Sequence, residues 1–199
     1  PHNPEPLPEN LTEISKLVVS ERADFGIVVD PDVDRLALVC EDGSMFGEEY
    51  TLVTVADFVL SKTPGNTVSN LSSTRALSDI TNKHKGSYEA SAVGEVNVVE
   101  KMKATNAIIG GEGNGGVIYP EMHYGRDSLI GIALFLTQLA ERKISARTLR
   151  DSYPNYFISK NKMKLTPEID LNFIFTALKE KFKHEKITII DGLKIDFKE

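Results

Sequence analysis

Segments with strand-like and helix-like apolar patterns alternate over the first 150 residues, and this alternation restricts the fold more than any other feature. Residues 25–29 and 36–40 are continuous apolar runs typical of buried strands, whereas residues 11–22 show helical spacing behind Asn10, a good helix cap. Further helices are predicted over 48–61, 75–83, 95–104 and 127–142, and further strands over 67–70, near Tyr88 and over 107–109. This rhythm predicts an α/β fold of layered, mixed and largely parallel sheets with flanking helices.

The pattern changes after residue 149. Tyr153-Pro154-Asn155 breaks the pattern, because proline cannot continue a helix, so a domain hinge is predicted there. Beyond it we expect an extended segment over 156–165, a helix over 171–182 and a strand over 187–190.

Three carboxylates stand at alternate positions directly after the first predicted strand. Asp30, Asp32 and Asp34 are closed by Arg35, and the second strand follows at once. Alternating acids on a turn bring their oxygens together, and such carboxylates repel one another unless a hard dication neutralises them. The sequence therefore predicts a Mg²⁺ site, with an acidic turn that is merely solvated as the alternative.

A calcium-binding EF-hand is a second alternative for the same residues. Asp30, Asp32, Asp34 and Glu41 fall on positions 1, 3, 5 and 12 of that loop. Position 6 of the loop demands glycine, however, and here it is Arg35. The flanking segments are also strand-like rather than helical, so the pattern disfavours an EF-hand.

A glycine-rich segment, residues 110–116, follows the strand predicted over 107–109. Its five glycines allow the backbone to approach a ligand closely, and its two remaining side chains are Glu112 and Asn114. A carboxylate and an amide together suit the vicinal hydroxyls of a sugar. Neither the dinucleotide fingerprint nor the Walker pattern is present, and a flexible turn is the alternative.

Composition excludes several classes of protein. The formal net charge is −6 and no basic stripe is visible, which argues against nucleic acid as a partner. No apolar run approaches the ~20 residues of a membrane-spanning helix, so no membrane partner is expected. The single cysteine, Cys40, lies in a predicted buried strand and favours a reducing, cytoplasmic compartment.

The order and spacing of these motifs resemble the α-D-phosphohexomutase superfamily, which includes phosphoglucomutases, phosphomannomutases and phosphoglucosamine mutases. The resemblance rests on residues 3–11, 30–35, 93–97, 110–116 and 123–127. Members have four domains, and the resemblance implies that this chain is an internal fragment. It implies the end of domain 2 with the metal loop over 1–43, domain 3 with the sugar-recognition loop over 44–154, and the start of domain 4 over 155–199. Domain 1 and most of domain 4 would then be missing partners from the same polypeptide.

The resemblance also implies roles for individual residues. Asp30, Asp32 and Asp34 match the three metal ligands, whose fourth ligand is a phosphoserine in domain 1. Arg35 matches a catalytic arginine that holds the transferring phosphoryl group, although it could simply pair with the acids. Glu112 and Asn114 match the two substrate-contacting positions of domain 3, where the family usually has glutamate and serine. Gly116 stands where many bacterial members carry a histidine, so that histidine's acid or base role cannot be transferred.

The expected function is that of a phosphohexomutase, an intramolecular phosphotransferase that interconverts hexose 1-phosphate and 6-phosphate through a phosphoserine and a bisphosphorylated intermediate. The substrate would be a glucose, mannose or glucosamine phosphate, and the fragment itself is expected to be inactive. The alternatives are a non-catalytic module that binds sugar phosphate or a divalent cation, and a phosphatase with an aspartate nucleophile. Arg75, His123 and Arg126 are weaker candidates, because capping or structural pairing explains them equally well.

Overall fold

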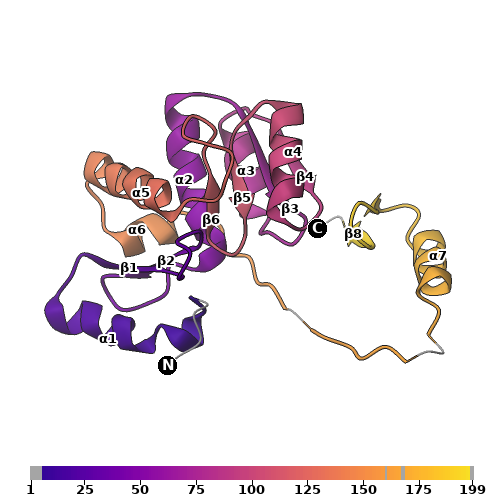
Figure 1. Ribbon diagram of the computed structural model, residues 1–199, viewed down its shortest axis with the longest axis horizontal. Helices are drawn as coiled ribbons and strands as arrows, with labels where there is room; N and C mark the ends of the chain where they lie inside the picture. The colour runs from indigo at the N-terminus through magenta and orange to yellow at the C-terminus, as the bar shows by residue number, and fades with distance from the viewer. Residues whose placement is uncertain (1–5, 160, 167–168, 198–199) are drawn as a thin grey trace. The chain divides into compact units, whose positions relative to one another are not determined.

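The chain folds into two units, the first ending at Tyr156 and the second beginning at Phe157 (Figure 1). The computed structural model describes residues 6–159, 161–166 and 169–197. The first unit contains, in chain order, the 3-10 turn η1 (Pro8–Asn10), α1 (Thr12–Glu21), β1 (Phe25–Val29), β2 (Leu36–Cys40), α2 (Glu48–Lys62), β3 (Asn66–Asn70), α3 (Ala76–Lys83), β4 (Tyr88–Ser91), α4 (Glu95–Thr105), β5 (Ala107–Glu112), β6 (Gly116–Ile118), α5 (Ser128–Arg142) and α6 (Ala146–Asp151). The second contains α7 (Leu171–Lys181), β7 (Lys186–Thr188) and β8 (Lys194–Asp196).

The two predicted apolar strands form an antiparallel hairpin. Phe25 pairs with Cys40 and Val29 pairs with Leu36, which leaves residues 30–35 as the connecting turn. All five residues of β2 are buried, because α1, α2, α5 and α6 pack against this strand. Burial raises the pKa of the Cys40 thiol to about 11, so Cys40 is an unreactive core residue at neutral pH.

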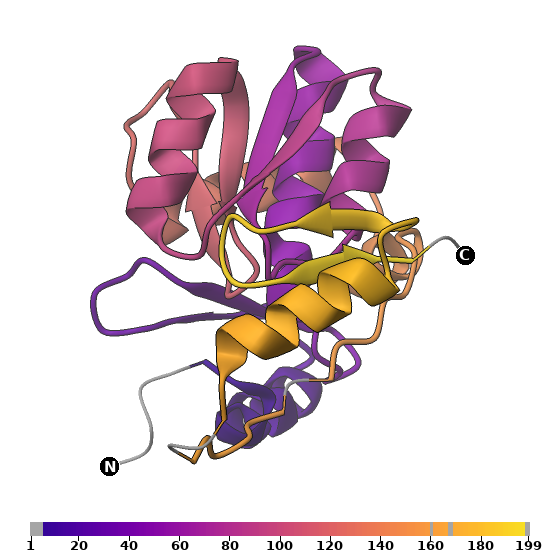
Figure 2. The same ribbon diagram turned by 90° about the vertical axis from the view of Figure 1, so that its right-hand side faces the viewer.

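A second sheet has the strand order β4-β3-β5-β6. β3 pairs in parallel with β4 and with β5, whereas β6 runs antiparallel to β5. The helix α4 covers one face of this sheet, and α2 and α3 cover the other (Figure 2). The predicted fold class, an α/β fold with a mixed and largely parallel sheet, is confirmed.

The core lies on both faces of the four-stranded sheet. On the α4 face, Val98 and Met102 pack with Val68 of β3 and Ile118 of β6. Val117, the neighbour of Ile118, belongs to the larger cluster on the other face, because successive strand residues point to opposite sides. The middle of α2 is buried on all sides, since the sheet, α3, α5 and β2 surround this helix.

Two local expectations are corrected, and a short helix is present that was not expected. Asn10 does not cap the first helix, because the turn η1 extends through it and the N-cap position is Leu11. The helix α6 was not predicted, although Ser145 caps it by accepting a hydrogen bond from the Thr148 amide. The last predicted strand, 187–190, is shorter and ends at Thr188 as β7.

In the second unit, β7 and β8 form an antiparallel pair after α7. Phe182 and Phe197 pack edge to face, with ring centroids 5.3 Å apart. The division into domains over 1–43, 44–154 and 155–199 stays a prediction. Within the part of the chain that the structure describes, no helix has the length and apolar character needed to cross a bilayer.

A buried carboxylate ties the helices of the first unit together. Asp57 of α2 is 1% exposed at its side chain, and its oxygens lie 2.7 Å from His84 Nε2 and 2.7 Å from Arg142 NH2. The Tyr153 hydroxyl donates to the same carboxylate at 3.0 Å. Burial acts to raise the pKa of Asp57, but hydrogen bonds from His84 and Arg142 outweigh it and hold the pKa below its usual value.

Replacing Asp57 by asparagine is expected to lower the free energy of unfolding at pH 7 by about 3 kcal/mol, because Arg142 and Lys83 lose a buried counter-ion. A lowered pKa adds stability that is present above the unfolded value and is lost as pH falls through the folded one. Urea unfolding between pH 7 and pH 3 should therefore show a smaller loss for the variant than for the native chain. Glu141→Gln, which alters an exposed pair with Lys62, is the matched control and should change stability by less than about 1 kcal/mol.

Candidate metal and sugar site

The acid loop is a tight turn held by its own first residue. Asp30 Oδ1 accepts hydrogen bonds from the amides of Asp34, at 3.1 Å, and Arg35, at 3.0 Å. Val33 adopts a left-handed backbone with φ of 59°, which is strained for a β-branched residue. The turn therefore keeps a strained backbone conformation at Val33 while its carboxylates lie on one side.

The three predicted ligands do lie together. Asp30, Asp32 and Asp34 each offer an oxygen, and these oxygens lie within 4.8 Å of one another. Burial raises the pKa of Asp34, and the charges of Asp30 and Asp32 raise it further against the nearby Arg126. For Asp30, burial acts in the same direction, but the amides of Arg35 and Asp34 outweigh it and lower the pKa.

This donor set fits a hard divalent cation. The oxygens come only from carboxylates, which are the ligands that Mg²⁺ and Ca²⁺ prefer. Asp34 Oδ1 is buried and lacks a hydrogen-bond partner among the described residues, so an oxygen of the cluster is left for a ligand. The acidic triad could therefore bind a metal ion.

Arg35 lies beside the acids rather than away from them. Its Nε atom is 3.6 Å from Asp30 Oδ2 and 3.9 Å from Asp34 Oδ1. The Arg35 side chain is 30% exposed as a whole, whereas its Nε atom is buried. Pairing with the acids is thus present in the structure, and contact with a phosphoryl group stays a prediction.

The glycine-rich segment is a β-hairpin rather than an open loop, because β5 continues to Glu112 and β6 begins at Gly116. Glu112 is buried, and its Oε1 accepts from the Asn70 amide group at 2.7 Å and from the Gly94 amide at 3.2 Å. Asn114 is half-buried in the turn, where its Oδ1 accepts from the Gly116 amide. Glu112 is therefore firmly held by the protein, and Asn114 is the more accessible of the two.

The hairpin is docked on the acid loop, although 75 residues separate the two motifs. The Leu36 amide donates to Gly115 O at 3.1 Å, and the Ser128 amide donates to Val33 O at 3.1 Å. Gly115 has φ of 89°, and a Cβ there would lie 2.4 Å from Leu36 O, so only glycine allows this approach. The predicted metal and sugar residues therefore form one site.

The residue that sequence reasoning undervalued is Arg126. Its guanidinium forms ion pairs with Asp34 Oδ2, with Glu112 Oε2 at 3.1 Å and with Glu95 Oε2 at 3.1 Å. It thus contacts both the acid loop and the hairpin. An arginine a few residues after the glycine-rich segment was the available signal, but its three partners lie 14 to 92 positions away and only the fold brings them together.

Sequence models of known families match two parts of the chain. The model of phosphoglucomutase/phosphomannomutase alpha/beta/alpha domain III matches residues 47–156, more than half of the chain. The chain belongs to the phosphoglucomutase/phosphomannomutase family. The model of domain II matches residues 1–43, so the acid loop lies in the domain II match and the glycine hairpin in the domain III match. The predicted membership of the α-D-phosphohexomutase superfamily is confirmed.

Individual relatives agree with this family. A phosphoglucomutase/phosphomannomutase of Thermococcus kodakarensis is 33% identical over 98% of the chain, and a phosphoglucosamine/phosphogalactosamine mutase of Sulfurisphaera tokodaii is 29% identical over 96%. The crystal structure of a family protein from Burkholderia thailandensis matches 99% of the chain with a TM-score of 0.79 and 28% identity. In each case the chain spans 43% of the length of the relative.

Two weaker candidates lie at the edge of the site or outside it. His123 is half exposed and pairs with Asp127, whose carboxylate caps α5 by accepting from two backbone amides. Arg75 is the residue before α3, and its side chain does not cap that helix. A role for either residue in the site stays a prediction.

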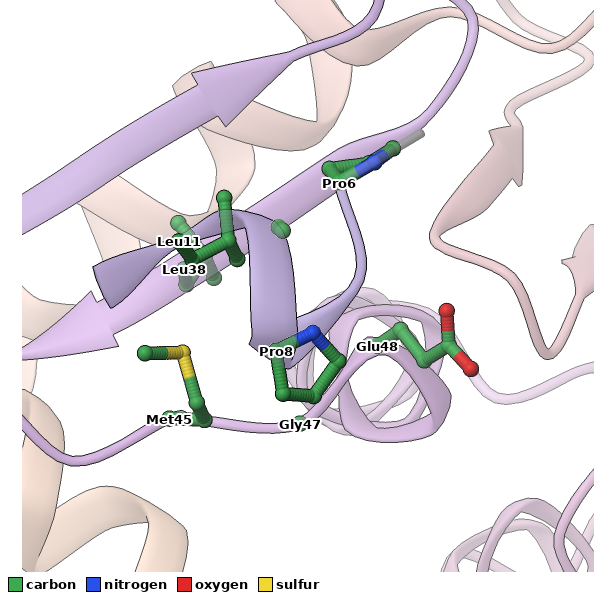
Figure 3. A pocket seen from close by; sticks show the side chains of 8 residues that line it. Pro6, Pro8, Leu11, Leu38, Met45, Gly47 and Glu48 are labelled. Atoms are coloured by element: carbon green, nitrogen blue, oxygen red, sulfur yellow. The ribbon is translucent and has the colours of Figure 1, made fainter. Parts of the chain in front are cut away.

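A small pocket lies elsewhere in the first unit, between η1 and β2 (Figure 3). Its lining is mostly apolar and consists of Pro6, Pro8, Leu11, Ala37, Leu38, Met45, Gly47 and Glu48. It contains none of the family residues assigned to metal or sugar, so it is separate from the candidate site.

Proposed function

We propose that this chain supplies the metal loop and the sugar-recognition hairpin of a phosphohexomutase. The observation that carries the proposal is that the acid triad and the Glu112 hairpin form one site, linked by backbone hydrogen bonds and by Arg126. The relatives are mutases of hexose phosphates by name, which supports the same reaction class. The whole enzyme would interconvert hexose 1-phosphate and 6-phosphate through a phosphoserine and a bisphosphorylated intermediate.

We assign the metal to Mg²⁺, held by Asp30, Asp32 and Asp34. When bound, the ion would supply Lewis-acid activation of a phosphoryl group. Arg35, whose side chain is 30% exposed beside the triad, would hold the phosphoryl oxygens by charge-assisted hydrogen bonds. The phosphoserine and the groups that grip the distal phosphate are assigned to domains 1 and 4, outside this chain.

Glu112 and Asn114 would orient the hexose rather than perform chemistry. Glu112 Oε2 retains acceptor capacity beside its contact with Arg126, and Asn114 presents an amide group at the hairpin turn. Adjacent sugar hydroxyls can be read in either orientation by such a pair, as the two phosphoryl transfers require. The substrate would be a glucose, mannose or glucosamine phosphate, in line with the different substrate names that the relatives carry. We place the enzyme in the cytoplasm, which suits the free thiol of Cys40.

The 199-residue chain by itself is expected to show no mutase activity, because neither phosphoserine nor phosphate-gripping loop has been assigned to it. The assay follows conversion of glucose 1-phosphate to glucose 6-phosphate by the purified chain with Mg²⁺ and glucose 1,6-bisphosphate. The full-length polypeptide that contains the chain is the positive control and should be active. Conversion by the 199-residue chain would contradict the assignment of the phosphoryl-handling groups to other domains.

A non-catalytic module that binds a divalent cation is the second candidate, and the acid triad favours it for the chain alone. The two functions are separated by the full-length polypeptide. If that polypeptide binds Mg²⁺ and glucose 1-phosphate but converts none of it, the binding module is the correct function.

A further inference from the structure

Building on the proposed metal site, we propose that Arg126 is a positioning residue that aims Asp34 at the metal and fixes the metal loop to the sugar hairpin. Its side chain is 15% exposed, and its guanidinium contacts three carboxylates that come from three different segments. Asp34 belongs to the acid loop, Glu112 ends β5 and Glu95 begins α4. A single side chain therefore joins the two halves of the site.

The two oxygens of Asp34 have different surroundings. Oδ2 pairs with the Arg126 guanidinium, whereas Oδ1 is buried, lies 3.9 Å from Arg35 Nε and has no hydrogen-bond partner among the described residues. Because Arg126 holds Oδ2, Oδ1 is the Asp34 oxygen that is left to bind the ion. Groups that hold a metal ligand in this manner fix its orientation and tune its affinity for the ion.

Arginine suits this position for reasons of geometry as well as charge. Its planar fork presents several donors at once, and here separate nitrogens reach Asp34, Glu112 and Glu95. The Arg126 amide also donates to Glu95 Oε1 at 3.3 Å, so Glu95 holds both the backbone and the side chain of this residue. Lysine would keep the charge but could not reproduce this set of contacts.

Charge in the cluster also leaves room for a dication. Its carboxylates are Asp30, Asp32, Asp34, Glu95 and Glu112, and its guanidinium groups are Arg35 and Arg126. The acids therefore remain in excess after Arg126 has paired. Arg126 can orient Asp34 without taking the place of the metal ion.

Gly116 gives Arg126 its space. A Cβ at this position would lie 2.5 Å from Arg126 Cδ, closer than real atoms approach. Any side chain at position 116 would therefore force the Arg126 side chain to shift. The glycine that ends the hairpin turn and the arginine ten residues later act together in this chain.

The experiment measures Mn²⁺ affinity of the 199-residue chain by the electron spin resonance signal of free Mn²⁺, with circular dichroism to confirm folding. Arg126→Lys and Gly116→Ala both conserve every charge and disturb the contacts through which Arg126 holds Asp34, Glu112 and Glu95. We expect about tenfold weaker Mn²⁺ binding for Arg126→Lys and about threefold weaker binding for Gly116→Ala. Arg147→Lys, which alters an exposed arginine paired with Asp151, is the matched control and should leave the affinity unchanged.

The outcomes separate this inference from the proposed function. If the native chain does not bind Mn²⁺ more tightly than Asp32→Asn does, the metal site itself is wrong. If the native chain binds Mn²⁺ at the triad and a folded Arg126→Lys or Gly116→Ala chain binds it equally well or more tightly, the positioning role of Arg126 is overturned. A purely structural role would lower the thermal midpoint of the variants and leave the affinity of the folded protein intact.

Discussion

Asp32→Asn is expected to reduce turnover of the full-length enzyme about a thousandfold, because a metal ion contributes several kcal/mol to phosphoryl transfer and one of its charged ligands becomes neutral. Asp32 is the informative member of the triad. Asp30 also closes the turn through two amides and Asp34 also pairs with Arg126, so their replacement would disturb the structure as well. Asp32 is exposed, and its replacement should leave the fold intact.

Turnover is measured against Mg²⁺ concentration, with thermal unfolding as the check on folding. Asp24→Asn is the matched control, because it removes an exposed carboxylate just before β1 without touching the acid loop. That control should keep native activity at every Mg²⁺ concentration. An Asp32→Asn enzyme with native turnover at limiting Mg²⁺ would show that residues 30–35 are only a turn.

Glu112→Ala is expected to lower kcat/KM of the full-length enzyme roughly ten- to two-hundredfold, since a hydrogen bond from a substrate hydroxyl to a charged acceptor contributes about 1.5–3 kcal/mol. The metal site should change much less. Arg126 keeps its contacts with Asp34 and Glu95 when Glu112 is lost, so Mg²⁺ affinity is expected to stay within about twofold of native.

Asn114→Ser is the companion variant and should cost less, because serine keeps a hydroxyl that can both donate and accept. Kinetics with glucose, mannose and glucosamine phosphates would show whether this change also shifts the preference among them. If Glu112→Ala leaves kcat/KM intact for all three, the hairpin is a structural turn and the sugar assignment is wrong.

The local pattern of this chain was strong enough to predict most elements. Continuous apolar runs identified β1 and β2. The acids between these two runs were therefore expected on the turn that connects the strands. The predicted helix boundaries were wrong where two local structures competed for the same residues. Asn10 is a residue type that often caps helices, yet Pro8 starts a 3-10 turn that includes Asn10. The six-residue helix α6 is too short to show a helical period of apolar residues.

Alternate spacing of Asp30, Asp32 and Asp34 was enough to bring their oxygens together, because a tight turn allows few other arrangements. The glycines after β5 likewise predicted close approach of a backbone. The sequence could not show which segment this backbone approaches. Only the fold shows that Gly115 meets Leu36 of the metal-loop hairpin, and that a β-hairpin rather than a flexible loop carries Glu112.

The sequence by itself was enough to predict the grouping of the three acids and a close backbone approach at the glycines, because carboxylate spacing and glycine content are local properties. Tertiary structure alone decided how the two motifs meet. Arg126 read as an ordinary loop arginine, since each of its partners lies on a different segment and no local pattern links them. An ion pair between distant segments depends on how β2, β5 and α4 pack, and packing is a property of the whole chain.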